Sequence, residues 1–261
     1  MTLTEIKREL AARGMRPLAR FGQNFLHDQN AARAVVADAL AGQPAGSTVL
    51  EVGPGLGALT GLLLEAGCPV TALEIDRGLA AFLRERFAAA PGFTLREGDA
   101  LRLLPETAAP QLVAGNLPYY ISGPLLAGFL AFSPPPRRMV LTLQKEVAER
   151  LAAKPGTEAY GALTVQVQSA YAARLSRVLP PSVFYPQPEV DSAVVVLDLL
   201  PAPHLPEGER AAFLAFVKKG FSQRRKKLSN TLGVPEDRRP DALSVAEWVA
   251  LWRRFGAAAG S

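Results

Sequence analysis

The sequence predicts an α/β fold with a parallel, doubly wound sheet, followed by a small helical domain. Short apolar runs alternate with segments of helical periodicity through the first part of the chain. A glycine-rich turn at residues 53–57 follows the first of these buried runs and opens a helix. Beyond the linker Pro201-Ala202-Pro203, only helical patterns remain. We therefore expect an α/β domain with an N-terminal extension at residues 1–200, and a helical domain at residues 201–261.

Strands and helices are expected to alternate along the larger domain. Short apolar runs predict strands at residues 48–52, 70–75, 93–96, 112–115, 139–143 and 190–200. Apolar side chains three and four residues apart predict helices at residues 4–12, 29–40, 59–66, 79–88, 124–132, 146–153 and 162–171. The tail is expected to form helices at residues 207–219, 222–232 and 245–255. Because helical crossovers join parallel strands, this order favours a parallel sheet.

Composition narrows the class of protein. The chain has 261 residues and a hydrophobic fraction of 49%, enough for a sizeable core. Its formal charge of +5 is compatible with a polyanionic partner. The single Cys68 cannot form an internal disulfide, as is typical of the cytoplasm. Residues 1–20 lack the apolar core of a secretory signal, and no run is long enough to span a bilayer. His27, His204 and one cysteine cannot assemble a metal cluster, so we expect no metal.

The glycine turn predicts a nucleotide-containing cofactor. Gly53, Gly55 and Gly57 let the backbone approach a ligand, and Glu74 ends the second strand where a carboxylate can bind ribose hydroxyls. This pattern fits a dinucleotide or S-adenosylmethionine. Glu51 would repel a pyrophosphate but suits a ligand with an ammonium and a sulfonium group. Pro54 removes a backbone N–H from the turn, which also weakens an anion site.

Asp99 follows the third strand, where its side chain can accept a hydrogen bond from an adenine amine. In doubly wound sheets ligands bind at the carboxyl ends of the strands, so Asp99 and Glu74 should lie together. These features favour S-adenosylmethionine, with S-adenosylhomocysteine as the product.

Asn116-Leu117-Pro118-Tyr119 is the candidate catalytic stretch, at the end of the fourth strand. The Asn116 side-chain oxygen and the Leu117 carbonyl can accept the two hydrogens of an adenine amine. Pro118 fixes the backbone, and Tyr119 can stack on the base. We expect Phe184, with Tyr185 as the second choice, to close the other face. Because the methyl donor carries its own leaving group, positioning should supply most of the acceleration.

A dense basic cluster predicts contacts with RNA phosphates. Its residues are Lys218, Lys219, Arg224, Arg225, Lys226 and Lys227. A base must leave its stack to reach Asn116, so a loop or single-stranded target is expected. Arg13, Arg16 and Arg20 form a second candidate strip.

The chain resembles the KsgA family of small-subunit ribosomal RNA adenine dimethyltransferases. The resemblance is carried by residues 21–26 (FGQNFL), 51–57 (EVGPGLG), 73–76, 98–100, 115–119 (GNLPY), 144–148, 188–194 and 221–227. It implies a Rossmann-like class I S-adenosylmethionine-dependent methyltransferase domain. It also implies that the cofactor is bound by Asn24, Leu26, Gly53, Glu74, Asp99 and Asn116, to which the pattern itself adds Glu51 and Gly55.

The resemblance further implies dimethylation of the N6 amines of two adjacent adenosines in the 3′-terminal hairpin loop of 16S ribosomal RNA, during late 30S assembly. The partner would be a pre-30S particle in the cytoplasm, and nothing in the sequence suggests a dimer. One residue departs from the family pattern, because Tyr120 stands where an Asn usually follows the Asn-Leu-Pro-Tyr motif. Other hypotheses are a large-subunit methyltransferase of the erythromycin-resistance type, an assembly factor acting mainly by binding, and a nicotinamide enzyme.

Overall fold

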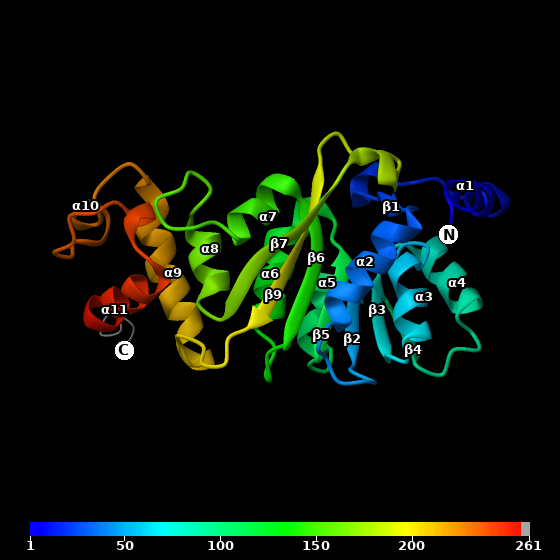
Figure 1. Cartoon of the computed structure of the whole chain (residues 1–261), viewed down its shortest axis with the longest axis horizontal. Helices are drawn as coiled ribbons and strands as arrows, with labels where there is room; N and C mark the ends of the chain where they lie inside the picture. The colour runs from blue at the N-terminus through cyan, green and yellow to red at the C-terminus, as the bar shows by residue number, and fades with distance from the viewer. Residues whose placement is uncertain (257–261) are drawn as a thin grey trace. The chain divides into compact units, whose positions relative to one another are not determined.

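A computed structural model describes residues 1–256 and divides the chain into two compact units (Figure 1). The first unit contains Met1–Lys145 and Ser176–Val196. The second contains Glu146–Leu175 and the described residues from Leu197 onward. The expected boundary at residue 200 differs from this division, because residues 146–175 pack with the C-terminal helices. No helix in the described part of the chain has the length and apolar character needed to cross a membrane.

A seven-stranded sheet has the order β4-β3-β2-β5-β6-β9-β7. Its strands are β2 (Val49–Val52), β3 (Val70–Glu74), β4 (Phe93–Glu97), β5 (Leu112–Asn116), β6 (Arg138–Gln144), β7 (Tyr171–Leu179) and β9 (Ser192–Leu199). The pairs from β4 to β6 are parallel. The chain runs outward from β2 to β4 and then returns to the other side of β2 with β5. This reversal creates a switch point between β2 and β5, where ligands bind in such sheets.

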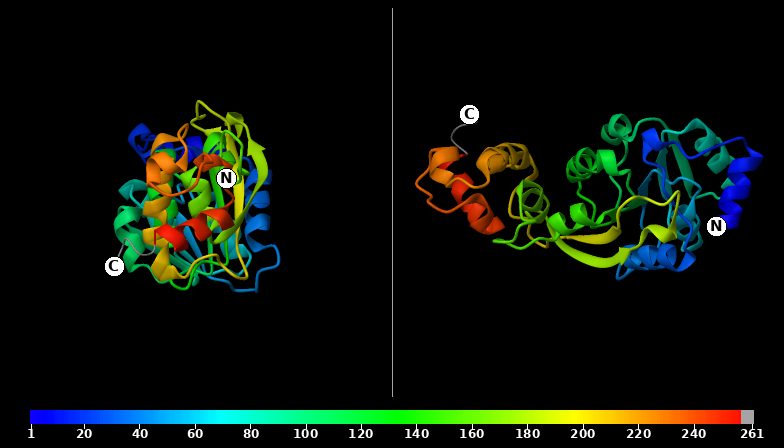
Figure 2. Two further views of the ribbon diagram at one scale, coloured as in Figure 1. Left: turned by 90° about the vertical axis from the view of Figure 1, so that its left-hand side faces the viewer. Right: turned by 90° about the horizontal axis from the view of Figure 1, so that it is seen from above.

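Helices cover both faces of the sheet in the first unit (Figure 2). They are α1 (Leu3–Ala12), α2 (Gln29–Leu40), α3 (Ala58–Glu65), α4 (Arg77–Arg86), α5 (Ala100–Leu103) and α6 (Ser122–Leu130). Val35 of α2 and Leu63 of α3 pack with strand residues such as Val49 and Val140 in one buried cluster. Helices α1 and α4 share another cluster through Ile6 and Leu83. The apolar faces of these helices are thus buried against the sheet and against one another.

A two-stranded ladder joins the N-terminal segment to a later loop. Strands β1 (Phe25–Leu26) and β8 (Phe184–Tyr185) are antiparallel, with Phe25 opposite Tyr185 and Leu26 opposite Phe184. Short 3₁₀ turns lie at η1 (Ala19–Phe21), η2 (Leu104–Glu106), η3 (Tyr119–Ile121) and η4 (Pro181–Val183). The ladder holds in place the segment that contains Asn24 and Leu26, both expected to bind the cofactor.

The second unit is helical and has its own aromatic core. Its helices are α7 (Lys145–Leu151, which begins at the last residue of the first unit), α8 (Ala162–Gln168), α9 (Arg210–Gly220), α10 (Leu228–Leu232) and α11 (Val245–Phe255), with 3₁₀ turns η5 (Glu207–Glu209), η6 (Phe221–Gln223) and η7 (Pro240–Ala242). Trp248 stacks on Phe221 with ring centroids 5.4 Å apart. The buried Tyr160 donates its hydroxyl hydrogen to the Leu243 carbonyl at 2.8 Å. This bond links residues 146–175 to the C-terminal segment.

Several elements differ from the sequence-based expectation, which did not include the short β1, β8 and α5. Residues 171–179 form strand β7, whereas the predicted helix at 162–171 ends at Gln168. The helix expected at 222–232 is interrupted, because Lys227 is extended with ψ of 150° and α10 begins only at Leu228. Helix α4 begins at Arg77 because the Asp76 side chain accepts hydrogen bonds from the Gly78 and Leu79 backbone N–H groups.

Candidate active site

Two adjacent cavities in the first unit lie where strands β2, β3, β4 and β5 end. The larger is lined by six of the residues predicted to bind the cofactor: Asn24, Gly53, Gly55, Glu74, Asp99 and Asn116. The smaller is lined by Glu51 and Leu26. The two cavities share Asn24, Phe25, Gly53, Gly55 and Asn116. All the predicted cofactor residues therefore gather at the switch point of the sheet.

The turn after β2 exposes backbone to these cavities. Gly53, Gly55 and Gly57 have φ angles of +67°, +60° and +79°, which L side chains rarely adopt. A Cβ atom added to Gly55 would also lie 2.9 Å from Cδ1 of Phe25. The turn needs glycine for its conformation and for its closeness to Phe25. A bound molecule can consequently approach the main chain directly.

Glu74 ends β3 and is fixed by two backbone N–H groups. Its carboxylate accepts from Gly55 at 3.3 Å and from Asp76 at 2.9 Å. The residue is only 4% exposed, and burial raises the pKa of its carboxyl to about 7, although the Asp76 and Gly55 N–H groups act in the opposite direction. A carboxylate held at the edge of the cavity is the group expected to accept ribose hydroxyls.

Glu51 lies deeper, beneath the glycine turn. It is 2% exposed, and Thr60 donates its hydroxyl hydrogen to the carboxylate at 2.6 Å. Burial raises the pKa of this carboxyl to about 7; the Thr60 hydrogen bond opposes the change and the charge of Glu74 adds to it. A buried acid with this pKa becomes a carboxylate most readily beside a cation. Glu51 is therefore suited to a ligand that carries an ammonium group.

Asp99 follows β4 and begins α5. Its Oδ1 atom accepts a hydrogen bond from the Leu101 N–H at 3.0 Å, and the side chain is 39% exposed. Gly98, just before it, has a φ of +149°. The carboxylate keeps acceptor capacity on the cavity side of the sheet, since one backbone bond does not saturate its two oxygens.

The N-terminal loop is tied to the end of β3 by Gln23. Its Nε2 donates to Asp76 Oδ2 at 3.1 Å, and its Oε1 accepts from the Leu18 N–H at 2.8 Å. Gln23 belongs to the family-like stretch at residues 21–26, but the sequence alone assigned it no role. A contact between residues 53 positions apart leaves no local signal in the sequence. Other cavity-lining residues that sequence reasoning did not assign include Phe21, Phe25, Ile75, Leu79 and Leu101.

Asn116 is the central polar residue of the site. Its Nδ2 donates to the backbone carbonyl of Asn24 at 2.8 Å. Its Oδ1 is buried and has no hydrogen-bond partner among the described residues. A buried acceptor without a partner costs stability, so Asn116 Oδ1 is available to a donor supplied by a ligand.

The residues after Asn116 fix the orientation of an aromatic ring. Leu117 is buried, and its N–H donates to the Thr142 carbonyl at 3.1 Å. Pro118 lies beside the glycine turn, with its Cδ 3.8 Å from the position of a Cβ on Gly53. The Tyr119 hydroxyl forms a 2.6 Å hydrogen bond with the Ser192 hydroxyl. Burial raises the pKa of Tyr119, so its hydroxyl stays neutral.

Phe184, predicted to close one face of the base, is buried in this structure. It is 1% exposed and packs in a buried cluster with Leu26, Ala32 and Val36 rather than lining either cavity. In this structure the Phe184 ring contributes to the packing behind β1. Tyr185, the second choice, is partly exposed and has the Lys7 ammonium 5.2 Å from its ring centroid.

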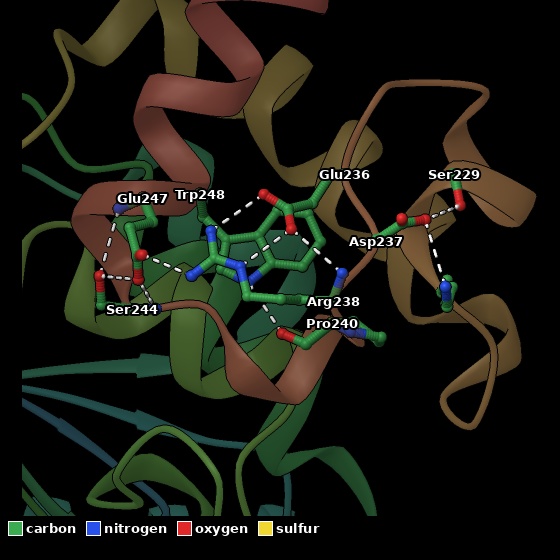
Figure 3. A network of polar contacts seen from close by, with 9 residues as sticks. Ser229, Glu236, Asp237, Arg238, Pro240, Ser244, Glu247 and Trp248 are labelled. Atoms are coloured by element: carbon green, nitrogen blue, oxygen red, sulfur yellow. Dashed lines mark hydrogen bonds and ion pairs between the residues drawn. The ribbon is translucent and has the colours of Figure 1, made fainter.

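The predicted basic cluster lies in the second unit. Lys218 and Lys219 are in the last turn of α9, and residues 224–227 connect η6 to α10. All six side chains are exposed. Two are engaged within the protein: Arg224 donates to the Thr157 carbonyl at 3.1 Å, and Lys227 forms an ion pair with Asp237 at 3.4 Å (Figure 3 shows Asp237 and its neighbours).

Arg13 of the second candidate strip forms two ion pairs within the protein. Arg13 is bound to Glu85 at 2.7 Å and to Glu9 at 3.6 Å. Within the described residues, no group of three or more His, Cys, Asp or Glu side chains is placed to hold a metal ion.

Comparison with known families gives one match that covers most of the chain. Residues 16–246 match the model of the family described as "Ribosomal RNA adenine dimethylase". A protein named "Ribosomal RNA small subunit methyltransferase A" from Synechococcus sp. (strain JA-3-3Ab) is 45% identical over 88% of this chain and 84% of its own length. The protein of the same name from Magnetococcus marinus is also 45% identical, over 87% of this chain and 82% of its length.

Solved structures show the same fold. A dimethyladenosine transferase from Plasmodium falciparum superposes with a TM-score of 0.78 at 24% identity, and covers 89% of this chain and 98% of its own. The 23S rRNA methyltransferase ErmE superposes with a TM-score of 0.70 at 24% identity, over 89% of this chain and 99% of its own. The predicted Rossmann-like methyltransferase fold is therefore confirmed.

Proposed function

Because this chain belongs to the ribosomal RNA adenine dimethylase family, we propose that it dimethylates the N6 amines of two adjacent adenosines near the 3′ end of small-subunit ribosomal RNA. The small-subunit assignment is supported by relatives that carry this activity in their names at 45% identity. The observation that carries the chemistry is the buried, unpartnered Oδ1 of Asn116. It is the acceptor that an adenine amine requires.

The residues at the two cavities fit S-adenosylmethionine. Glu74 would hold the ribose hydroxyls, Asp99 the adenine amine, and Glu51 the methionyl ammonium. Asn24, Leu26, Gly53 and Gly55 line the same space. When bound, the cofactor supplies an electrophilic methyl group on a positively charged sulfur. Two buried carboxylates with raised pKa values complement such a cation and would disfavour a pyrophosphate.

Asn116 and Leu117 orient the target nitrogen. The adenine amine is a weak nucleophile, because its lone pair is delocalised into the ring. Acceptance of its N–H hydrogens by Asn116 Oδ1 and the Leu117 carbonyl favours a pyramidal nitrogen whose lone pair points at the methyl carbon. The Asn116 side chain is already oriented by its bond to the Asn24 carbonyl, so little reorganisation is needed. The step depends on positioning rather than on a strong general base.

Tyr119 holds the base in place. Its ring can stack on the flipped adenine, and the Ser192 hydrogen bond fixes the ring's position. Phosphate contacts come from the basic cluster of the second unit, chiefly Lys218, Lys219, Arg225 and Lys226. We infer that the substrate is a pre-30S particle, that the protein acts as a monomer, and that the reaction takes place in the cytoplasm where ribosomal subunits are assembled.

The test is methyl transfer from labelled S-adenosylmethionine to purified ribosomal subunits that lack the modification. We expect label in two adjacent adenosines of the small-subunit RNA, found as N6,N6-dimethyladenosine by mass mapping. Label confined to large-subunit RNA would instead support the erythromycin-resistance alternative. No label in either RNA would overturn the proposal. Calorimetry with S-adenosylhomocysteine and with NAD separately tests the choice of cofactor.

A binding role in subunit assembly is the second candidate function. The exposed basic cluster in a unit separate from the catalytic residues supports it, since RNA binding need not depend on transfer. A strain that carries only the Asn116→Ala variant distinguishes the roles. Full rescue of assembly by this inactive variant would favour binding as the main function, and no rescue would favour methylation.

A further inference from the structure

The two consecutive tyrosines of η3, Tyr119 and Tyr120, lie in different surroundings. The Tyr119 hydroxyl is bound to Ser192, and Tyr119 does not line the larger cavity. Tyr120 does line it, and its side chain is 56% exposed. The 3₁₀ turn thus places the Tyr119 hydroxyl against Ser192 and the Tyr120 ring at the cavity expected to hold the cofactor.

Tyr120 shares this cavity with residues expected to hold the adenosine of the cofactor. Ile75, Asp99 and Leu101 line the same cavity, after β3 and β4. A Cβ added to Gly22 would lie 3.5 Å from Cδ1 of Tyr120, so the ring is in van der Waals contact range of the N-terminal loop. The Tyr120 ring therefore lies beside the loop that carries Asn24.

Ile75 is also unusually exposed, at 40%, for a large apolar side chain. Among the exposed large hydrophobic residues of the described chain, only Ile75 and Tyr120 line the larger cavity. Apolar surface left open in a cavity that also contains acceptors such as Asp99 is typical of a binding site for a flat, partly polar ring. Adenine is such a ring, with two apolar faces and an amine at its edge.

The electrostatics are compatible with a neutral phenol at this position. Burial raises the pKa of Tyr120, and the charges of Asp99 and Glu74 raise it further. The hydroxyl consequently stays protonated and adds no negative charge to a site that already holds two acids. Its ring can cover an adenine without repelling the acids that bind the rest of the nucleoside.

We propose that Tyr120 covers the adenosine half of the cofactor site by placing its ring against the adenine, and so slows the release of cofactor and product. The inference rests on the proposed function. It concerns a residue at which this chain departs from the usual family pattern, where an Asn would offer no aromatic face. Tyr120 is thus a cofactor-retaining residue in addition to the groups that bind the cofactor's edges.

Calorimetry with S-adenosylhomocysteine tests this proposal on the full chain. We expect Tyr120→Phe to bind within about twofold of the wild type, and Tyr120→Asn and Tyr120→Ala to bind roughly tenfold more weakly. Adenosine alone should lose affinity by the same factor, because the contact is to the base. Stopped-flow displacement should show that the loss lies mainly in a faster dissociation rate. Val178→Thr is the control, since Val178 is 50% exposed and lines neither cavity.

The outcomes separate this inference from the proposed function. If wild-type protein fails to bind S-adenosylhomocysteine, the proposed function itself is wrong. If wild type binds and Tyr120→Ala binds equally well, the inference is overturned while the function stands. An equal loss in Tyr120→Phe would assign the contact to the hydroxyl and also overturn it. Unchanged melting temperatures for the variants would exclude general unfolding as the cause of weaker binding.

Discussion

The side chain of Asn116 is anchored to the backbone of Asn24, 92 residues away, by a 2.8 Å hydrogen bond from Nδ2 to the carbonyl oxygen. This bond decides which end of the amide faces the cavity. With Nδ2 engaged, Oδ1 remains as a buried acceptor with no partner among the described residues. The contact therefore links the N-terminal loop that surrounds the cofactor site to the group expected to orient the target amine.

Substitution of Asn116 should separate transfer from cofactor binding. Asn116→Ala removes the acceptor, so we expect the single-turnover methylation rate to fall roughly 100-fold or more, and affinity for S-adenosylhomocysteine to change much less. Asn116→Asp should bind the cofactor less well than Asn116→Ala, because it places a carboxylate oxygen against the Asn24 carbonyl. Quench-flow and calorimetry give the two quantities. The exposed Asn30→Ala variant is the control, and a normal rate in Asn116→Ala would contradict the assigned role.

Glu51 should lower the stability of the empty protein at alkaline pH. Its pKa is about 7 in the folded state, against an ordinary value of 4.5. The folded state therefore holds the proton more tightly, and ionisation favours unfolding as pH rises from about 4.5 to 7. Glu51→Gln removes this charge and can still accept from Thr60. We expect the variant to be about 1–3 kcal/mol more stable than wild type at pH 8, and equally stable near pH 4.5.

Urea unfolding at a series of pH values measures this difference. Glu65→Gln, an exposed site on α3, controls for the loss of one negative charge. A constant difference between Glu51→Gln and wild type at all pH values would show that the gain comes from packing rather than from proton binding.

Much of this arrangement follows from local sequence patterns. Strands β2, β3, β5 and β6 are mostly apolar runs. Turns with glycine or aspartate place Gly53, Glu74 and Asp99 at or just after the ends of β2, β3 and β4. Because parallel strands align their carboxyl ends, sequence order alone predicts that these residues gather at one edge. The predicted cofactor residues consequently line two adjoining cavities.

The remaining features depend on contacts that have no local signature. Strand β7 lies at the edge of the sheet, and its buried and exposed residues do not alternate, so the period of two that identifies a strand is absent. Two-residue strands such as β1 and β8 are too short for any period. The burial of Phe184 has no local signature either, because the short strand β8 that carries it pairs with the distant β1.

The basic cluster should contribute unequally to RNA binding. Lys227 is paired with Asp237, whereas no ion pair with a described residue occupies Arg225 or Lys226. We expect the double variant Arg225→Gln, Lys226→Gln to weaken binding and to reduce the slope of log K against log salt by about 0.7–0.9 for each phosphate that is no longer neutralised. Lys227→Gln should reduce the slope less. Filter binding to a small-subunit RNA fragment at several salt concentrations measures both.

The control for the Arg225, Lys226 double variant also removes two positive charges from the second unit. Arg253→Gln, Arg254→Gln alters two exposed cations on α11 and should leave the salt slope near that of wild type. If both double variants reduce the slope equally, net charge rather than the cluster determines binding.

The ion pairs of Arg238 should stabilise the second unit in a way that depends on pH and salt (Figure 3). Arg238 binds Glu236 at 2.9 Å and Glu247 at 2.6 Å, and Glu247 also accepts from Ser244 at the start of α11. Arg238, followed by Ser244, lowers the pKa of Glu247 to about 2. Since the folded-state pKa is depressed, the stabilisation is present above the ordinary value of 4.5 and is lost as pH falls toward 2.

Glu247→Gln keeps an amide oxygen for Ser244 but removes the ion pair with Arg238. Because Arg238 and Glu247 are 47% and 45% exposed, we expect a loss of no more than about 1 kcal/mol at pH 7. The loss of stability should be smaller in 1 M salt, because the Debye length falls to about 3 Å and the exposed ion pair is screened. Both tryptophans, Trp248 and Trp252, lie in this unit, so their fluorescence reports its unfolding directly. A loss that is unchanged by 1 M salt would assign the effect to the helix cap, because the cap bonds to Ser244 do not require the Arg238 charge.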